Sequence, residues 1–287
     1  MVNLAAAAVR WVEMPELPEV ETIRRELSAK LLGRRFCDVE IHDEKPLRGI
    51  SPRDFRRRLI GQRIGSISRS GKYLLFHLSS GETLIIHLRM TGVLLLNPAD
   101  QERFIRIVFK FDDDTQLVFT DVRRFGAVYL VKNKSDVVGA LGVEPLSEEF
   151  TPETLARLLA KRRAPIKAVL LDQTVIAGIG NMYADESLFS ARIHPLTPAG
   201  KLNPDQIKAL HRAIQRILLR AIGKGGASVS TYRRPGGEIG TAHFDFKVAH
   251  CGGKKCPRCR AEIQRVKVRN RSSYYCPRCQ LVASVAT

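Results

Sequence analysis

From Arg63 to Leu96 the sequence reads RIGSISRSGKYLLFHLSSGETLIIHLRMTGVLLL, and its pattern sets the expected fold class. Runs rich in β-branched, aromatic and other apolar residues alternate there with turn signals such as SSGE at residues 79–82. A second run of this kind spans residues 103–131 and turns at DDDT, residues 112–115. Several short strands at this spacing predict a β-sandwich.

A helix is predicted just before these strands. Glu19 and Glu21 favour its N-terminal end through the helix dipole, and Gly33 is a natural stop. At steps of three and four residues, one apolar face is formed by Val20, Ile23, Leu27 and Leu31.

After residue 145 the pattern becomes helical. The segment TPETLARLLAKR, residues 151–162, opens with an N-cap threonine, then a proline and an early glutamate. Residues 223–240, GKGGASVSTYRRPGGEIG, predict a long flexible loop, which is either functional or a surface connector. The whole pattern predicts an α+β fold, with further helices over about 165–173, 181–190 and 204–222.

The C-terminal segment contains two Cys-x-x-Cys pairs separated by sixteen residues, a β-hairpin length. Such pairs supply four thiolates for a tetrahedral zinc ion; redox or disulfide pairing is the alternative. Four ligands leave no open position, so we expect one structural Zn²⁺. Cys37 and Cys251 fall outside the pattern and are expected to be free thiols. The predicted ligands are Cys256, Cys259, Cys276 and Cys279.

The charge balance is strongly basic, with 47 Lys+Arg against 29 Asp+Glu and a net charge of +18. This excess favours a polyanionic partner, nucleic acid first and an anionic membrane surface second. No apolar run approaches the roughly 18 residues needed to span a bilayer. The segment VNLAAAAVRWV, residues 2–12, lacks the basic start of a signal peptide. Nine Lys or Arg between Lys254 and Arg278 make the zinc segment a candidate DNA contact.

Six motifs in order resemble formamidopyrimidine-DNA glycosylase: MPELPEVETIRREL, RSGKYLL, HLRMTG, TDVRRFGA, GIGNMYADESLF and the four-cysteine finger. The resemblance runs from Met14 to about Gln280. It implies a β-sandwich domain, a helix–two-turns–helix domain and a zinc finger, with double-stranded DNA in the cleft between them. The domains expected are 14–145, 146–245 and 246–287, after a non-family extension, 1–13.

In the family the nucleophile is the amine of an N-terminal proline, which here is Pro15. Its secondary amine would attack C1′ of the damaged nucleotide and form an iminium ion, an electron sink for strand cleavage. Inside a chain Pro15 is an amide without a basic nitrogen. Therefore translation starts at Met14, or the extension is cleaved, or lyase chemistry has been lost; we favour the first.

The resemblance assigns further catalytic roles. Glu16 would protonate the leaving base or opening sugar, and Glu19 and Glu186 could orient the amine. Lys72 would contact the damaged nucleotide and assist β-elimination. Arg271 would hold the phosphate beside the lesion, because its guanidinium binds phosphate bidentately, and is linked to δ-elimination.

Other residues are assigned to the DNA itself. Asn181, at the GIGN turn, resembles a second phosphate clamp, and Arg162 matches a further backbone contact. Met90, Arg123 and Phe125 resemble the trio that fills the gap left by a flipped nucleotide, with Arg123 facing the orphaned cytosine. The chain departs from the family at Phe104, where a DNA-contacting histidine is common. The loop 223–240 matches the segment that covers the flipped base, although its sequence is poorly matched.

The sequence thus predicts a monomeric, bifunctional DNA glycosylase and AP lyase acting on oxidised purines such as 8-oxoguanine and formamidopyrimidines. We expect it in the bacterial cytoplasm, associated with the nucleoid and with no membrane partner. One alternative is an endonuclease VIII-like enzyme for oxidised pyrimidines, against which PELPE and RRFG argue. The other is a non-catalytic, zinc-dependent damaged-DNA-binding protein that retains residues 1–13.

Overall fold

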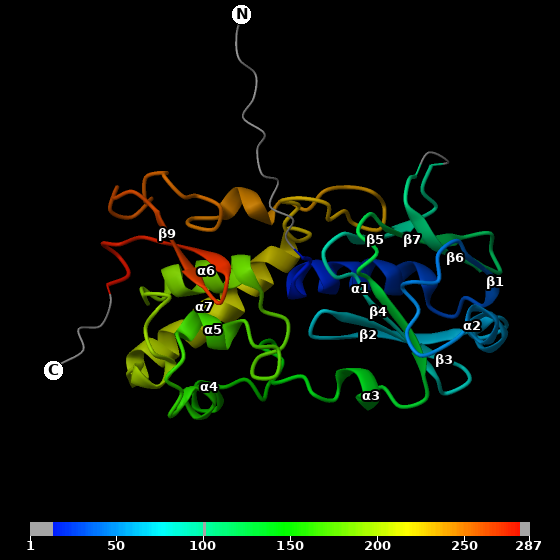
Figure 1. Ribbon diagram of the computed structural model, residues 1–287, viewed down its shortest axis with the longest axis horizontal. Helices are drawn as coiled ribbons and strands as arrows, with labels where there is room; N and C mark the ends of the chain where they lie inside the picture. Colours follow the sequence, from blue (N-terminus) through cyan, green and yellow to red (C-terminus); the bar gives the residue numbers. More distant parts are fainter. Residues whose placement is uncertain (1–13, 100–101, 282–287) are drawn as a thin grey trace, which may run out of the picture.

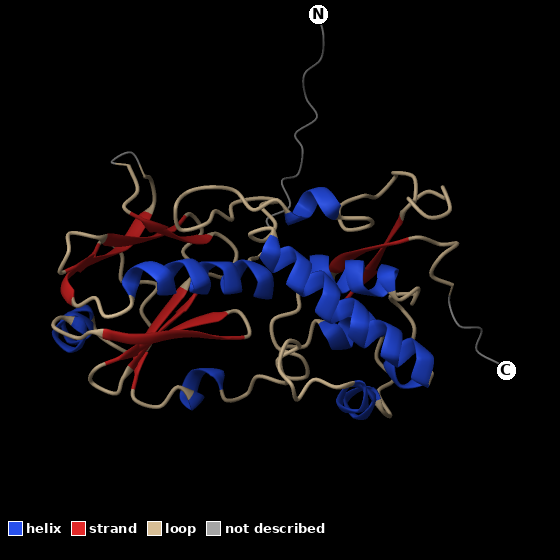
Figure 2. Cartoon of the chain, turned by 180° about the vertical axis from the view of Figure 1, so that it is seen from behind, coloured by secondary structure: helices blue, strands red, loops and turns tan. Residues whose placement is uncertain are grey.

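The computed structural model describes residues 14–99 and 102–281. One half of the molecule holds two β-sheets around a long helix, and the other holds a group of helices and a small β-hairpin (Figure 1). The same division is seen from behind (Figure 2). The predicted extension, 1–13, lies outside the described residues. Among those described, no helix is both long and apolar enough to cross a membrane.

Two four-stranded antiparallel sheets form the sandwich, as the strand pattern predicted. The buried faces of both sheets share one hydrophobic cluster. The first sheet has the order β1 (Phe36–Ile41), β6 (Ile105–Phe111), β7 (Gln116–Asp121), β5 (Gly92–Leu96). The second has the order β2 (Ile64–Ser70), β3 (Tyr73–Leu78), β4 (Thr83–His87), β8 (Ala127–Val131).

The long helix α1 (Leu17–Leu31) belongs to the same cluster. Its four predicted apolar positions are all at most 1% exposed. Gly33 follows with φ of +77°, a left-handed conformation that glycine adopts without the steric cost of a Cβ. Pro18 lies in the first turn, where the missing N–H costs no helical hydrogen bond.

The helical half begins with α4 (Pro152–Leu159), capped by Thr151, whose Oγ1 accepts from Thr154 N at 3.1 Å. Its helices share a second hydrophobic cluster. The helix predicted over 165–173 is shorter than expected and ends at Leu170. The other elements are α5 (Ile166–Leu170), α6 (Asn181–Ser190), the 3₁₀ turns η1 (Ala199–Lys201) and η2 (Ala242–Asp245), and α7 (Pro204–Gly223).

The C-terminal hairpin consists of β9 (Gln264–Val268) and β10 (Arg271–Tyr275). It packs on α6, where Asp185 Oδ2 accepts from Tyr274 N at 3.0 Å. The two halves also meet at the start of α1, where Leu17 N donates to Gly178 O at 3.0 Å. This junction places the first residues of α1 beside the N-terminus of α6.

Candidate active site

A cavity of about 220 Å³ lies at the junction of the two halves. It brings together residues that are far apart in the sequence and that the family resemblance singled out. Met14 lines it, and the adjoining Pro15 is buried. The predicted site residues among its lining are Glu16, Lys72, Asn181 and Arg271.

The Glu16 carboxylate is held at the N-terminus of α6. Its Oε2 accepts from Gly180 N at 2.7 Å, and its Oε1 accepts from Met182 N at 2.9 Å. Backbone N–H groups at a helix N-terminus form a natural binding place for an anionic group. A Cβ on residue 180 would lie only 2.3 Å from Glu16 Cδ, so this approach requires glycine. The GIGN turn therefore positions an acid of the site as well as Asn181.

Glu19 is fully buried one helical turn further on. Its Oε2 accepts from Glu16 N at 2.8 Å, and its Oε1 accepts from Tyr183 Oη at 2.6 Å and from Ala227 N at 2.8 Å. Burial raises the pKa of Glu19, and burial with the nearby Glu19 raises the pKa of Tyr183 well above its ordinary value. Glu19 thus fixes the backbone beside Pro15 and ties it to α6 and to the loop 223–240.

Glu186 is engaged elsewhere. Its Oε1 accepts from the backbone N–H groups of Lys247, Val248 and Ala249 at 2.8, 2.8 and 2.9 Å. These bonds assign Glu186 to holding the segment that leads into the zinc finger. We therefore correct the expectation that it orients the Pro15 amine.

Lys72 lies in the turn between β2 and β3 and is only 5% exposed. His87 is a neighbour, and its pKa is lowered to about 3 by burial and by the positive charges of Arg89 and Lys72. A neutral His87 adds no positive charge against Lys72. The cavity lining therefore includes a lysine that is almost fully buried.

Arg271 and Asn181 lie on separate elements of the helical half. Arg271 is the exposed first residue of β10, and Asn181 is the first residue of α6. Both line the same cavity. A guanidinium and a helix N-terminus are both suited to a phosphate group.

The three predicted gap-filling residues lie together on the outside of the sandwich. Arg123 Nη1 is 3.4 Å from Met90 Sδ, and the Arg123 guanidinium carbon is 4.7 Å from the centre of the Phe125 ring. Phe125 is 45% exposed, which is unusual for an aromatic side chain with no partner molecule. We call this partly exposed group of one methionine, one arginine and one phenylalanine the tip.

Asp121 supports this tip, a role that the sequence analysis missed. Its carboxylate is fully buried and accepts from Gly126 N at 2.7 Å and from Arg123 N at 3.2 Å. Thr91, directly after Met90, donates its hydroxyl to the same carboxylate. The aspartate in TDVRRFG is therefore the signal that could have been used.

Arg162 and Phe104 lie apart from the cavity lining. Arg162 is exposed after α4, and its Nε donates to Leu158 O at 2.7 Å. Phe104 is 51% exposed with φ of +61°, and its carbonyl accepts from Asp121 N at 3.0 Å. Phe104 is thereby joined to Asp121, whose carboxylate also accepts from Arg123 N.

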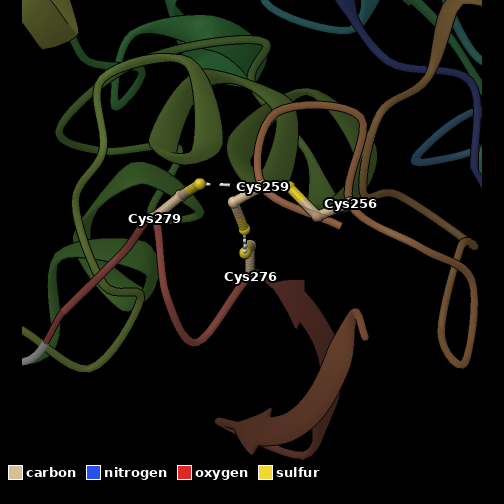
Figure 3. Close-up of side chains that lie close together, drawn as sticks. All are labelled: Cys256, Cys259, Cys276 and Cys279. Atoms are coloured by element: carbon tan, nitrogen blue, oxygen red, sulfur yellow. Dashed lines mark hydrogen bonds between the residues drawn. The ribbon is translucent and has the colours of Figure 1, made fainter. Parts of the chain in front are cut away.

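The four C-terminal cysteines gather around one point (Figure 3). Their sulfur atoms all lie within 4.8 Å of one another, with Cys256 Sγ 3.9 Å from Cys279 Sγ and Cys259 Sγ 3.4 Å from Cys276 Sγ. Tetrahedral zinc with bonds of about 2.3 Å places sulfurs about 3.8 Å apart, so the donor set fits this ion. The chain binds one structural zinc ion here.

Comparison with known families accounts for this arrangement. Residues 14–128 match the formamidopyrimidine-DNA glycosylase N-terminal domain, residues 141–233 match its H2TH domain, and residues 253–282 match the zinc finger found in FPG and IleRS. The chain belongs to the formamidopyrimidine-DNA glycosylase family. The resemblance read from the six motifs is thereby confirmed.

Relatives of this family match nearly the whole chain. The formamidopyrimidine-DNA glycosylase of Chloroflexus aurantiacus is 46% identical over 93% of this chain and 98% of its own length. That of Symbiobacterium thermophilum is 43% identical over 94% of this chain and 90% of its own length. The Lactococcus lactis Fpg in complex with DNA containing an abasic site has a TM-score of 0.86 and 38% identity, covering 93% of this chain and 99% of that one.

Proposed function

We propose that this chain is a DNA glycosylase and AP lyase of base excision repair that releases oxidised purines from duplex DNA. The observation that carries the proposal is the cavity shared by Glu16, Lys72, Asn181 and Arg271, beside the buried Pro15. The Lactococcus lactis enzyme has been solved with DNA containing Fapy-dG and with DNA containing an abasic site. We extend these substrates, together with 8-oxoguanine, to this glycosylase.

The first chemical step uses Pro15 once its amine is free. An α-amine has a reference pKa of roughly 8, so a substantial part is neutral and nucleophilic near neutral pH. The nitrogen forms a bond to C1′, the bond from C1′ to the base breaks, and Glu16 supplies a proton to the departing base or the opening sugar. Loss of the amine proton and opening of the ring give the iminium ion.

Strand cleavage then follows from the electron demand of the iminium. Removal of the C2′ proton and departure of the 3′ phosphate complete β-elimination. Removal of the C4′ proton and departure of the 5′ phosphate complete δ-elimination, and water releases the sugar fragment. Lys72 would contact the nucleotide during the first elimination, while Arg271 and Asn181 would hold phosphates.

The exposed tip of Met90, Arg123 and Phe125 would occupy the space of the flipped nucleotide. Bases in a duplex are hidden from the enzyme, so the lesion nucleotide leaves the stack. Phe125 and Met90 can wedge between bases, and Arg123 can bond to the orphaned cytosine. Arg162 would contact the DNA backbone farther out, and Phe104, which lacks the imidazole common at this position in the family, stays a proposed DNA contact.

We also keep the division into 14–145, 146–245 and 246–287 as a proposal, with the enzyme acting as a monomer. Its DNA substrate leads us to propose the bacterial cytoplasm, at the nucleoid, as its place of action. An endonuclease VIII-like preference for oxidised pyrimidines and a purely binding role are the alternatives.

The decisive experiment is borohydride trapping. Protein from the full sequence and protein whose chain begins at Pro15 after removal of Met14 would be mixed with duplex DNA carrying 8-oxoguanine opposite cytosine. Mass spectrometry would record the N-terminus of each preparation. Pro15→Ala would show whether trapping requires proline at this position. A covalent band with a free Pro15 supports the proposal.

The outcomes separate the alternatives. No band with this duplex, together with a band in a parallel reaction on a duplex carrying an oxidised pyrimidine, would favour the endonuclease VIII-like activity. Binding without a band from protein with a free Pro15 would leave a binding protein and overturn the lyase assignment.

A further inference from the structure

The turn that carries Lys72 is held from the other side of the domain junction. Glu144 lies in the segment that joins the two halves, and its Oε1 accepts from Gly71 N at 2.5 Å. The same carboxylate binds Arg69, with Arg69 Nη1 2.9 Å from Glu144 Oε2. The residue directly before Lys72 is thus fixed by a side chain 73 positions later.

Arg69 binds the carbonyl group of Gly71, whose N–H is bound by Glu144. Its Nη1 donates to Gly71 O at 2.8 Å, and its Nε lies 3.4 Å from Glu21 Oε2 on α1. The Arg69 side chain is only 9% exposed. Both the N–H and the C=O of Gly71 are therefore bound within one network of charged groups that links α1, the β2–β3 turn and the segment before α4.

Close packing makes this connection stiff. Gly71 has φ of +55°, and a Cβ there would meet Leu141 Cδ1 at 3.3 Å and Ala177 Cβ at 3.5 Å. Ala177 is followed by Gly178, whose carbonyl accepts from Leu17 N, directly after Glu16. The segment 177–178 therefore contacts both the Lys72 turn and the backbone that follows Glu16.

We propose that Glu144 is a positioning residue for strand cleavage, which acts by fixing the Lys72 ammonium relative to the sugar of the bound nucleotide. This inference rests on the proposed function, because it requires that Lys72 takes part in β-elimination. A displacement of about 1 Å at a reacting group can cost about 10²-fold in rate. A carboxylate bound to the backbone one residue away from Lys72 controls displacements of that size.

The test is a double-mutant cycle on a preformed abasic site. Single-turnover β-elimination would be measured for wild type, Lys72→Ala, Glu144→Ala and the double variant. We expect Glu144→Ala to lower the rate constant by about 10- to 100-fold. In the Lys72→Ala background the same change should have almost no effect, since coupled residues are not additive.

Two further variants separate positioning from loss of structure. Glu144→Gln keeps an oxygen that accepts from Gly71 N and should recover part of the rate. Glu82→Ala, the control matched to Glu144→Ala, breaks another part-buried pair, with Arg58, away from the cavity and should leave the rate unchanged. Melting temperature and affinity for a duplex with a tetrahydrofuran site would be recorded for each variant.

The outcomes for Lys72 and for Glu144 are distinct. An unaltered rate for Lys72→Ala would overturn the role of Lys72 in the proposed function. A slow Lys72→Ala combined with an unaltered Glu144→Ala, or with additive effects in the double variant, would overturn the positioning role alone.

Discussion

Gly180 N donates a hydrogen bond of 2.7 Å to Glu16 Oε2 across 164 residues of sequence. The bond joins the N-cap residue of α1 to the N-cap residue of α6. It places a carboxylate of the active site at the positive end of a helix, where backbone N–H groups need an acceptor. The geometry of Glu16 therefore depends on the absence of a side chain at residue 180.

Gly180→Ala should disable base release. The new Cβ would lie 2.3 Å from Glu16 Cδ, so Glu16 or the helix start has to move. We expect single-turnover release of 8-oxoguanine to fall by about 10²-fold or more, measured by chromatography of the free base. Gly65→Ala is the matched control, because its Cβ would meet only His77 O at 3.5 Å. A normal rate for Gly180→Ala would contradict the assigned position of Glu16.

Removal of zinc should disconnect Arg271 from the site. The four sulfurs within 4.8 Å enclose the metal, and Arg271 begins the strand that leads to Cys276. Structural zinc contributes directly to folding free energy, so a strong chelator should lower the melting temperature and the affinity for abasic-site DNA. Elemental analysis should give one zinc per chain in wild type and less in Cys276→Ser. Cys37→Ser, at an exposed thiol, should change neither the zinc content nor the melting temperature.

Arg123→Ala should reduce discrimination for cytosine opposite the lesion. A good side-chain contact to a base is worth about 1–3 kcal/mol of discrimination, or roughly 5- to 150-fold in relative affinity. The neighbouring Arg124 is the matched control, because its Nε is held by Asp43 Oδ2 at 2.6 Å. The loss of discrimination would be measured as dissociation constants for duplexes with each of the four bases opposite an abasic analogue. Equal loss of affinity for all four bases would mean that Arg123 contacts only the backbone.

Much of the fold was predictable because its long elements have clear periodicity. The helices α1, α4, α6 and α7 and the strands β2–β7 lie where the patterns placed them. The short β1, α2 (Pro52–Leu59) and α3 (Ser135–Val138) were missed. Only Phe55 and Leu59 of α2 are buried, so the helix has too few apolar positions to show a period. The helix is capped by Ser51, whose Oγ accepts from Asp54 N at 3.1 Å, and this serine is the sequence signal that could have been used.

The exchange of strands between the sheets was not predictable from local sequence. Residues 103–131 read as one hairpin, but β8 leaves β7 and pairs with β4 in the other sheet. Gly126 permits the sharp departure, because a Cβ there would lie 2.4 Å from Phe119 Cζ. Pairing of distant strands is decided by the common core, which local pattern does not report.

The active site likewise has residues that the sequence predicted and supporting residues that it did not. Motifs indicated Glu16, Lys72 and Arg271, and the structure brings them to one cavity. The residues that hold them, such as Glu144 beside the Lys72 turn, carry no motif of their own for a reader of one sequence. Their partners lie across tertiary contacts, so only the fold shows which carboxylate meets which backbone group.

Glu21 should give the protein an acid-dependent stability. Burial alone would raise the pKa of Glu21, but hydrogen bonds from Arg24 and Arg25 lower it from 4.5 to about 2. A carboxyl with a lowered folded pKa stabilises the fold above its unfolded pKa and loses this contribution as pH falls toward the folded value. Wild type should exceed Glu21→Gln by about 2–3 kcal/mol at pH 7 and by much less at pH 3, measured by urea unfolding. A difference that stays constant with pH would remove Glu21 as the cause.

Lys167 and Asp185 should couple stability to the position of Arg271. Lys167 Nζ lies 2.7 Å from Asp185 Oδ1 with both side chains at most 1% exposed, and it also donates to Ser272 O at 3.1 Å. Lys167→Met leaves a buried acid without its cation, at a cost of about 3–5 kcal/mol. Because the pair also binds β10, the affinity for abasic-site DNA should fall together with stability.

The pH dependence of that variant identifies the cause. Burial already raises the pKa of Asp185 above its ordinary value, and loss of the lysine charge raises it further. A carboxyl with a raised folded pKa binds a proton more readily in the folded state, so the variant should gain stability as pH falls from 8 to 6. Lys167→Met/Asp185→Asn should lose this gain and recover part of the stability at pH 8. If the double variant were as unstable as Lys167→Met at every pH, the lost contact to Ser272, and not the unpaired acid, would account for the damage.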